Sequence, residues 1–174
     1  MYKLFKLFVM EINTTSSRMQ SLIVLYDMHT TYYKNVLEGI SDSDTHNRLN
    51  TKANHIAWLA GSMLQQRYEI ANLLGIDTSP ASNELFKDNK GIQDNITYPS
   101  LTQYKKDWEV IAPLLRDALI KVTDVKLNEP FEMMPDMKMA NFELITFFIY
   151  REANIIGQLA LWRRLLGYVA MKYM

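Results

Sequence analysis

Side chains able to carry acid–base or metal chemistry are few in this chain. It contains no cysteine and three histidines, His29, His46 and His55. Without cysteine, disulfides, thiolate catalysis and cysteine-containing zinc sites are excluded. One combination retains catalytic potential: His29 and His55 on facing helices, together with the carboxylate of Glu152. The alternative is that each histidine is a surface side chain or an ordinary hydrogen-bonded one.

The second notable feature is an arginine followed directly by a glutamate, Arg151 and Glu152. Neighbouring side chains on a helix point about 100° apart, so these two do not pair with each other. If Arg151 faces the interior of a bundle, it needs a carboxylate or an anion, because an unpaired buried charge is costly. Glu69, Asp27 or Glu38 could complete a buried salt bridge. Otherwise the sequence predicts a small anionic ligand near Arg151.

Helices must position these groups, because apolar residues recur at spacings of three and four along most of the chain. This periodicity predicts four helices, over about residues 19–40, 51–74, 100–122 and 142–166. Ser100 and Gln103 form an S-x-x-Q capping box for the third helix, and Asn141 can cap the fourth. The fourth segment is apolar nearly all round, which predicts a central position in the bundle. We therefore predict an all-α fold, a four-helix bundle.

Two connections in this bundle are long. Residues 76–99 are polar and without a clear period, and a connection of this length usually carries function, local structure or disorder. Residues 125–140 are rich in methionine and contain two prolines, which predicts an irregular or short hairpin connection.

Length and charge narrow the class of protein. The chain has 174 residues, which favours one domain over residues 1–174, with about residues 1–15 as an N-terminal extension. That extension either packs on the bundle or precedes a natural start at Met10. Nineteen basic and nineteen acidic residues cancel, so no global field attracts nucleic acid or an anionic membrane. No apolar run approaches the roughly 18 to 20 residues that cross a bilayer, and the expected location is the cytoplasm.

Two segments carry a resemblance to a known family. The segment NHIAWLAGS (residues 54–62) is similar to the N-x-I-x-W-x-x-G-H opening of the second helix in the DinB-like superfamily. The segment GQLALWRRLLG (residues 157–167) resembles the G-Q-L…R-R-L-L-G end of that family's fourth helix. The resemblance covers about residues 19–167. It implies an up-down-down-up four-helix bundle and a homodimer.

The resemblance also implies a site with three histidine ligands to a metal, one on the second helix and two on the fourth. In this sequence those positions hold Ser62, Arg151 and Ile155. Serine is a poor ligand for divalent metals, arginine cannot bind a cation, and isoleucine has no donor atom. His55 lies seven residues before Ser62 on almost the same helical face, so a shifted alignment would make it the first ligand. We predict no metal cofactor, with one divalent ion such as Zn or Ni as the alternative.

Two functional hypotheses follow from the residues and the resemblance together. The first is a DinB-like bundle that has lost the three-histidine site and has a non-catalytic or diverged role in binding a small molecule or a protein. Its candidate cavity residues are His55, Ser62, Arg151 and Glu152. The second is a metal-dependent thiol S-transferase or hydrolase-like enzyme, with a remodelled site built from His55, Glu152 and His29.

Overall fold

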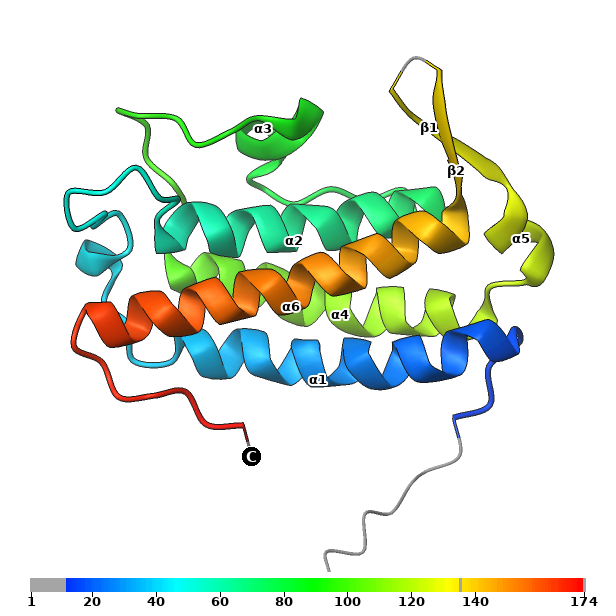
Figure 1. The fold of residues 1–174 in the computed structure, drawn as a ribbon, viewed down its shortest axis with the longest axis horizontal. Coiled ribbons are helices and arrows are strands. Elements are labelled where there is room, and N and C mark those ends of the chain that lie inside the picture. Colours follow the sequence, from blue (N-terminus) through cyan, green and yellow to red (C-terminus); the bar gives the residue numbers. More distant parts are fainter. Residues whose placement is uncertain (1–11, 135, 174) are drawn as a thin grey trace, which may run out of the picture.

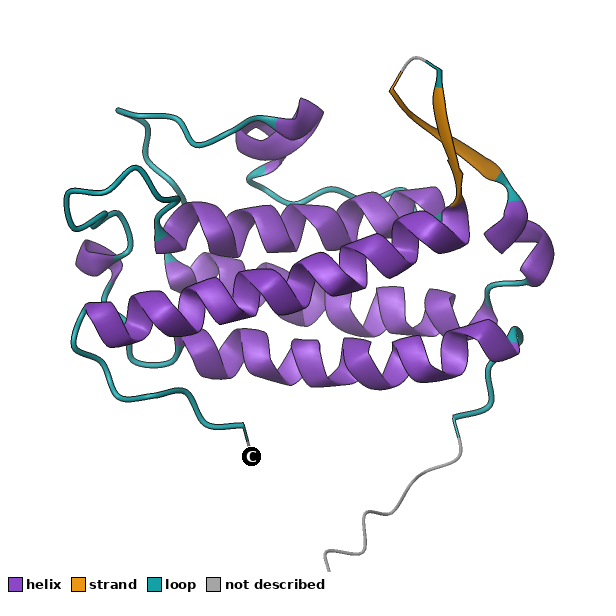
Figure 2. Ribbon diagram, viewed as in Figure 1, coloured by secondary structure: helices purple, strands orange, loops and turns teal. Residues whose placement is uncertain are grey.

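The computed structural model describes residues 12–134 and 136–173. The all-α prediction is confirmed, since helices dominate and one two-stranded hairpin is the only described sheet (Figure 2). Each of four long helices packs against two of the others, in the cyclic order α1, α4, α2, α6. In Figure 1, α1 and α6 run in one direction and α2 and α4 in the other. The bounds of these helices are α1 Gln20–Leu37, α2 Ile56–Leu73, α4 Leu101–Lys121 and α6 Asn141–Leu165.

Short elements fill the connections between the long helices. The connection at residues 125–140 is an antiparallel hairpin of β1 and β2, one of the two forms predicted for it. Residues 1–11 of the predicted N-terminal extension, including the alternative start at Met10, lie outside the described residues. The short elements are η1 Ser17–Met19, η2 Asp42–Asp44, α3 Asn83–Phe86, η3 Lys87–Asn89, α5 Asp124–Asn128, β1 Pro130–Met134 and β2 Met137–Ala140.

Two of the long helices begin at side-chain caps. Ser100 Oγ accepts a hydrogen bond from the backbone N–H of Gln103 at 3.2 Å, as the capping box predicts, although the Gln103 side chain turns to Asp107 instead. The cap of α2 is His55, whose Nδ1 accepts from the Trp58 N–H at 3.1 Å. The predicted start of this helix near residue 51 was therefore too early. A cap supplied by histidine is not among the usual sequence signals.

The start of α6 also differs from the prediction. Asn141 is the first residue of the helix rather than its cap, and its side-chain amide donates to the carbonyl of Lys126 at 2.9 Å. The carboxylate of Glu143 instead accepts the backbone N–H of Ala140 at 2.8 Å. Asn141 thus fastens the start of α6 to the end of α5.

The most enclosed helix is α2, so the predicted central position of α6 was wrong. Most residues of α2 are buried all round, because the segment 77–99 with α3 lies across its outer side (Figure 1). No segment among the described residues covers the outer face of α6 in this way, and large apolar side chains on it are exposed: Phe147, Tyr150, Leu161 and Leu165. Apolar periodicity identifies the side chains that can be buried, but a covering loop decides which helix is enclosed.

The cover over α2 fits closely at one glycine. A Cβ atom at Gly61 would lie 2.2 Å from Cζ of Phe86 and 2.5 Å from the hydroxyl oxygen of Tyr104. Both distances are far below van der Waals contact, so the packing of α3 and α4 onto α2 requires glycine here.

Substituting this glycine tests that packing. We expect Gly61→Ala to lower the free energy of unfolding by about 1–3 kcal/mol, because the added methyl overpacks the contact with Phe86 and Tyr104. The matched control is Gly157→Ala on α6, where no described atom would lie within 4 Å of the new Cβ. There, alanine should stabilise the helix by up to about 1 kcal/mol. Urea denaturation measures both changes, and equal effects at the two positions would contradict the close fit.

Candidate functional site

A buried ion pair between Arg67 on α2 and Glu152 on α6 lies at the centre of the bundle. Arg67 is fully buried and Glu152 is 1% exposed. The contact is bidentate, with Nε of Arg67 2.7 Å from Oε1 of Glu152 and Nη2 3.0 Å from Oε2. Two parallel charge-assisted hydrogen bonds of this kind fix the relative position of the two helices.

The other two long helices surround the same guanidinium. Cζ of Arg67 lies 3.6 Å from the ring centre of Trp108 on α4 and 3.9 Å from that of Tyr26 on α1. Nη1 of Arg67 also donates to Oγ1 of Thr30 at 2.8 Å. Rings on two sides and hydrogen bonds in the plane satisfy this buried cation. The pair therefore joins all four long helices.

His29 completes the network around the glutamate. Its Nδ1 lies 3.2 Å from Oε2 of Glu152, and the imidazole is buried. Burial by itself raises the pKa of Glu152. The interactions with Arg67 and His29 together lower the pKa by more than burial raises it, so the pKa lies below its usual value. Glu152 is thus an ionised structural group with both oxygens engaged.

Removing the charge of Glu152 tests its structural role. We expect Glu152→Gln to lower the free energy of unfolding by about 3–5 kcal/mol, because Arg67 stays buried without a counter-ion. Asp27→Asn is the matched control, since it breaks the half-exposed Asp27–Arg116 pair and should cost about 1 kcal/mol or less. The wild type should also lose stability as the pH falls below about 4.3 through the lowered pKa of Glu152, a loss that the variant lacks. Denaturation at several pH values measures both, and near-equal costs for the two variants would contradict this role.

Arg151 faces a different direction from Glu152, as the helical geometry predicts. Its Nη1 donates to Oε1 of Gln66 and its Nη2 to Oγ of Ser62, both at 2.7 Å. Both partners are neutral and belong to α2. Burial lowers the pKa of Arg151, and Glu69 and Glu152 offset this effect in part. A guanidinium stays protonated even so, and Arg151 is a half-buried cation held by neutral groups.

The predicted salt bridge of Arg151 is not formed by any of the three suggested carboxylates. Asp27 pairs with Arg116, with Oδ1 and Nε 2.7 Å apart, and Glu38 is exposed at the end of α1. Glu69 accepts a hydrogen bond from Gln65 at 3.2 Å. Within residues 12–134 and 136–173, no carboxylate oxygen lies within 4.0 Å of the Arg151 guanidinium. Glu152, which follows Arg151 in the sequence, is paired with Arg67.

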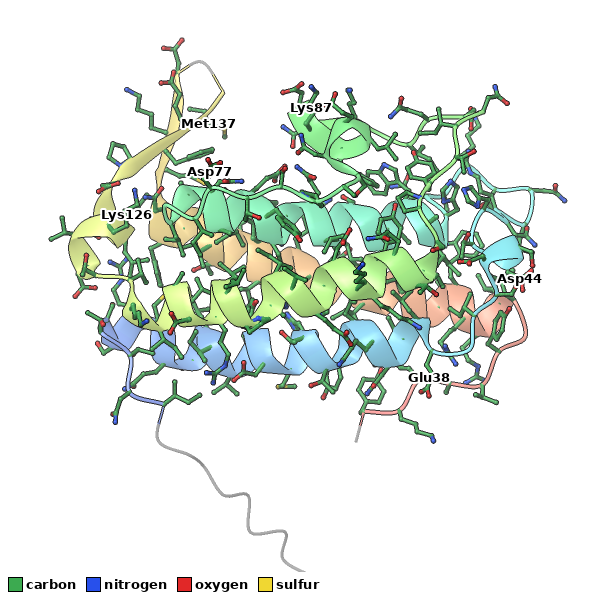
Figure 3. All side chains as sticks on the ribbon, turned by 180° about the vertical axis from the view of Figure 1, so that it is seen from behind. Glu38, Asp44, Asp77, Lys87, Lys126 and Met137 are labelled. Carbon is green, nitrogen blue, oxygen red and sulfur yellow. The ribbon has the colours of Figure 1, made fainter. Side chains whose placement is uncertain are left out.

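Arg151 and Ser62 line a cavity of about 820 Å³ above α2 and α6. Lys87, from the segment over α2, belongs to the lining. In Figure 3, Lys87 lies on the same side of the bundle as the hairpin that carries Met137. From α2, one stripe of side chains spaced by three and four residues faces the cavity: Trp58, Ser62, Gln65, Glu69 and Asn72. The hairpin contributes Phe131, and α6 contributes Leu144, Phe147, Phe148 and Arg151.

Two buried polar atoms in this lining lack a partner in the described part of the chain. They are Oε1 of Gln65 and Nε1 of Trp58. The Gln65 side chain is otherwise held by its amide nitrogen, which donates to Glu69 and to Asn83. Four other buried polar atoms without a described partner belong to residues outside the lining, so these atoms by themselves do not mark a ligand site.

The other predicted site residues lie elsewhere. Ile155 belongs to the hydrophobic core, and Glu152 belongs to the buried network with His29. His55 caps α2 two turns before Ser62 and packs against His46 and Tyr98, with ring centres 4.8 and 5.1 Å apart. The structure therefore brings Ser62 and Arg151 together, and separately His29 and Glu152, but His55 joins neither group.

This arrangement does not fit a divalent metal at the ligand positions that the resemblance implies. The Arg151 guanidinium contacts Ser62 directly, and a second cation there would be repelled. Nor does the His29–Glu152 contact offer a free carboxylate, since Arg67 engages both oxygens. Among the residues that the structure describes, no three histidine, aspartate or glutamate side chains gather as a metal site would require.

His55 generates a prediction about pH. Burial lowers the pKa of His55 to about 4, with His46 and Arg48 adding to this shift. Its unfolded pKa is about 6.5, so the stability that the neutral cap contributes is complete above that pH and is lost as the pH falls toward 4. We expect His55→Asn to keep the cap and to flatten the dependence of the melting temperature on pH between 7 and 4. An unchanged slope would contradict the assignment of this titration to His55.

Sequence reasoning missed Arg67, Gln65 and Gln66. Arg67 is the one charged residue between Ile56 and Tyr68, a stretch that reads as a buried helix. A charge in such a stretch indicates a buried pair, and that signal was available. The two glutamines carry no comparable signal, because glutamine is equally common on exposed helical faces.

Comparisons with known proteins add no relative. No known protein family matches this sequence, and no curated protein is significantly similar to it. As to membranes, none of the helices in residues 12–134 and 136–173 combines the length and hydropathy that a bilayer crossing requires.

Proposed function

We propose that this chain is a DinB-like bundle without the family's metal centre, and that its cavity binds a small anionic ligand at Arg151. The observation that carries the proposal is the environment of this arginine. It lines a cavity of about 820 Å³, and its two hydrogen-bond partners, Ser62 and Gln66, are neutral. A guanidinium has five N–H donors, so three remain for an anion in the cavity.

One contact supports the family assignment. The resemblance aligns Ser62 and Arg151 with two ligand positions that meet around one ion in the DinB-like superfamily. In this chain Nη2 of Arg151 and Oγ of Ser62 are 2.7 Å apart, across α2 and α6. An alignment that pairs the wrong residues would not be expected to bring two such distant positions together. The homodimer that the resemblance implies stays a prediction.

The fixed positive charge of Arg151 gives the proposed site its preference for anions. In a three-histidine site the ion attracts anionic groups of a substrate, and here the fixed charge of Arg151 takes that place. An enzyme of the metal-dependent thiol S-transferase or hydrolase-like type is the rival proposal. No contact of His55, Glu152 or His29 favours it, because these three side chains are committed to a helix cap and a buried ion pair.

Benzoate tests the proposed anion site. We expect benzoate to shift amide resonances around the cavity, and Arg151→Met to weaken this binding about tenfold or more, because a charge-assisted hydrogen bond is lost. The matched control is Arg116→Met, which removes the same charge from the pair with Asp27 on α1 and α4. Nuclear magnetic resonance titrations of the three proteins measure the affinities.

The stability of the same variant gives a second test. Arg151→Met should change the free energy of unfolding by about 1 kcal/mol or less, because no carboxylate is left buried alone. Equal benzoate affinity in the wild type and both variants would refute the anion site.

A further inference from the structure

We infer that the ligand of this cavity is a monocarboxylic acid with an apolar body, an acid whose single carboxylate meets Arg151 while its hydrocarbon part fills the space between aromatic walls. This inference rests on the proposed function and narrows it from any small anion to one chemical class. The charge of the lining and the composition of its walls each contribute to it.

The charges around the cavity favour a single negative charge. The cations of the lining are Arg151, Lys87 and Lys90. Nζ of Lys87 lies 2.7 Å from the carboxylate of Glu84, whereas Nζ of Lys90 donates to the neutral backbone carbonyl of Glu84 at 2.8 Å. The carboxylates of Glu69 and Asp88 line the same cavity. Three cations and two carboxylates leave the lining with one net positive charge, which a single carboxylate balances and a dianion exceeds.

The walls favour an apolar body. On one side lie Trp58 and Phe86, with ring centres 6.5 Å apart, and on the other lie Phe147 and Phe148, with ring centres 5.9 Å apart. The side chain of Phe131 from the hairpin adds a fifth ring. An ion as small as acetate or phosphate would leave these rings against water, while a hydrocarbon would bury them. A volume of about 820 Å³ lies in the range of ligand sites for molecules of drug size.

A series of probes that differ in one group tests the class of ligand. Octanoate, octanol, octyl phosphate and acetate are titrated into the wild type and into Arg151→Met, with Arg116→Met as the control for charge. We expect octanoate to bind at least about tenfold more tightly than octanol or octyl phosphate, and more tightly than acetate by a larger factor. The preference for octanoate over octanol should disappear in Arg151→Met and persist in Arg116→Met.

A second pair of variants tests the apolar wall. Phe147 is half-exposed and lines the cavity, and Tyr150 lies on the same helix outside that lining and is more exposed. Phe147→Ser should weaken octanoate about three- to tenfold and leave acetate unchanged, because it removes part of the apolar contact. Tyr150→Ser should leave both affinities unchanged. Because both positions are solvent-facing, neither variant is expected to unfold the protein.

The outcomes separate this inference from the proposed function. Octyl phosphate binding as tightly as octanoate, with both dependent on Arg151, would overturn the monocarboxylate and leave the anion site intact. Acetate binding as tightly as octanoate would overturn the apolar body alone. If octanol binds as well as octanoate and no affinity depends on Arg151, both the inference and the proposed function fail.

Discussion

The ion pair between Arg67 and Glu152 is the constraint on which the rest of this structure depends. A guanidinium and a carboxylate that are both withdrawn from water are tolerated only when geometry satisfies them completely. Here α1 contributes Tyr26, Thr30 and His29, α4 contributes Trp108, and the bidentate contact joins α2 to α6. Its bidentate geometry restricts the rotation of α6 against α2 more than non-directional apolar contacts do.

That constraint also places the candidate site. With Glu152 directed to the centre of the bundle, the neighbouring Arg151 points about 100° away, toward α2. It meets Ser62 and Gln66 there, and together with Ser62 it lines the cavity. One glutamate thus accounts for two charges: it neutralises Arg67 inside and, by setting the rotation of α6, directs Arg151 to the cavity. The position of the proposed anion site follows from how the core is paired.

The cavity has walls because α2 is covered. The segment 77–99 lies across that helix (Figure 1), and its contact at Gly61 holds Phe86 close to the backbone. The polar stripe of α2 that includes Ser62 and Gln65 would otherwise face open solvent, where it could hydrogen-bond freely to water. Under the cover, the same side chains become the lining of a partly enclosed space. Long connections commonly carry function in this way, by adding a wall to a rigid helical scaffold.

The sequence by itself determined the all-α class, the four long helices within a few residues, and the divergence between Arg151 and Glu152, because these follow from local periodicity. It also determined that arginine and isoleucine cannot ligate a metal, which is a property of the side chains alone. Only the tertiary structure decided that Glu152 pairs with Arg67, that His55 caps a helix, and that Arg151 keeps neutral partners. Arg67 and Glu152 are 85 residues apart in the sequence, and they pair because the faces of α2 and α6 that carry them meet in the bundle. The apolar periodicity of a single helix does not tell which faces of two helices meet.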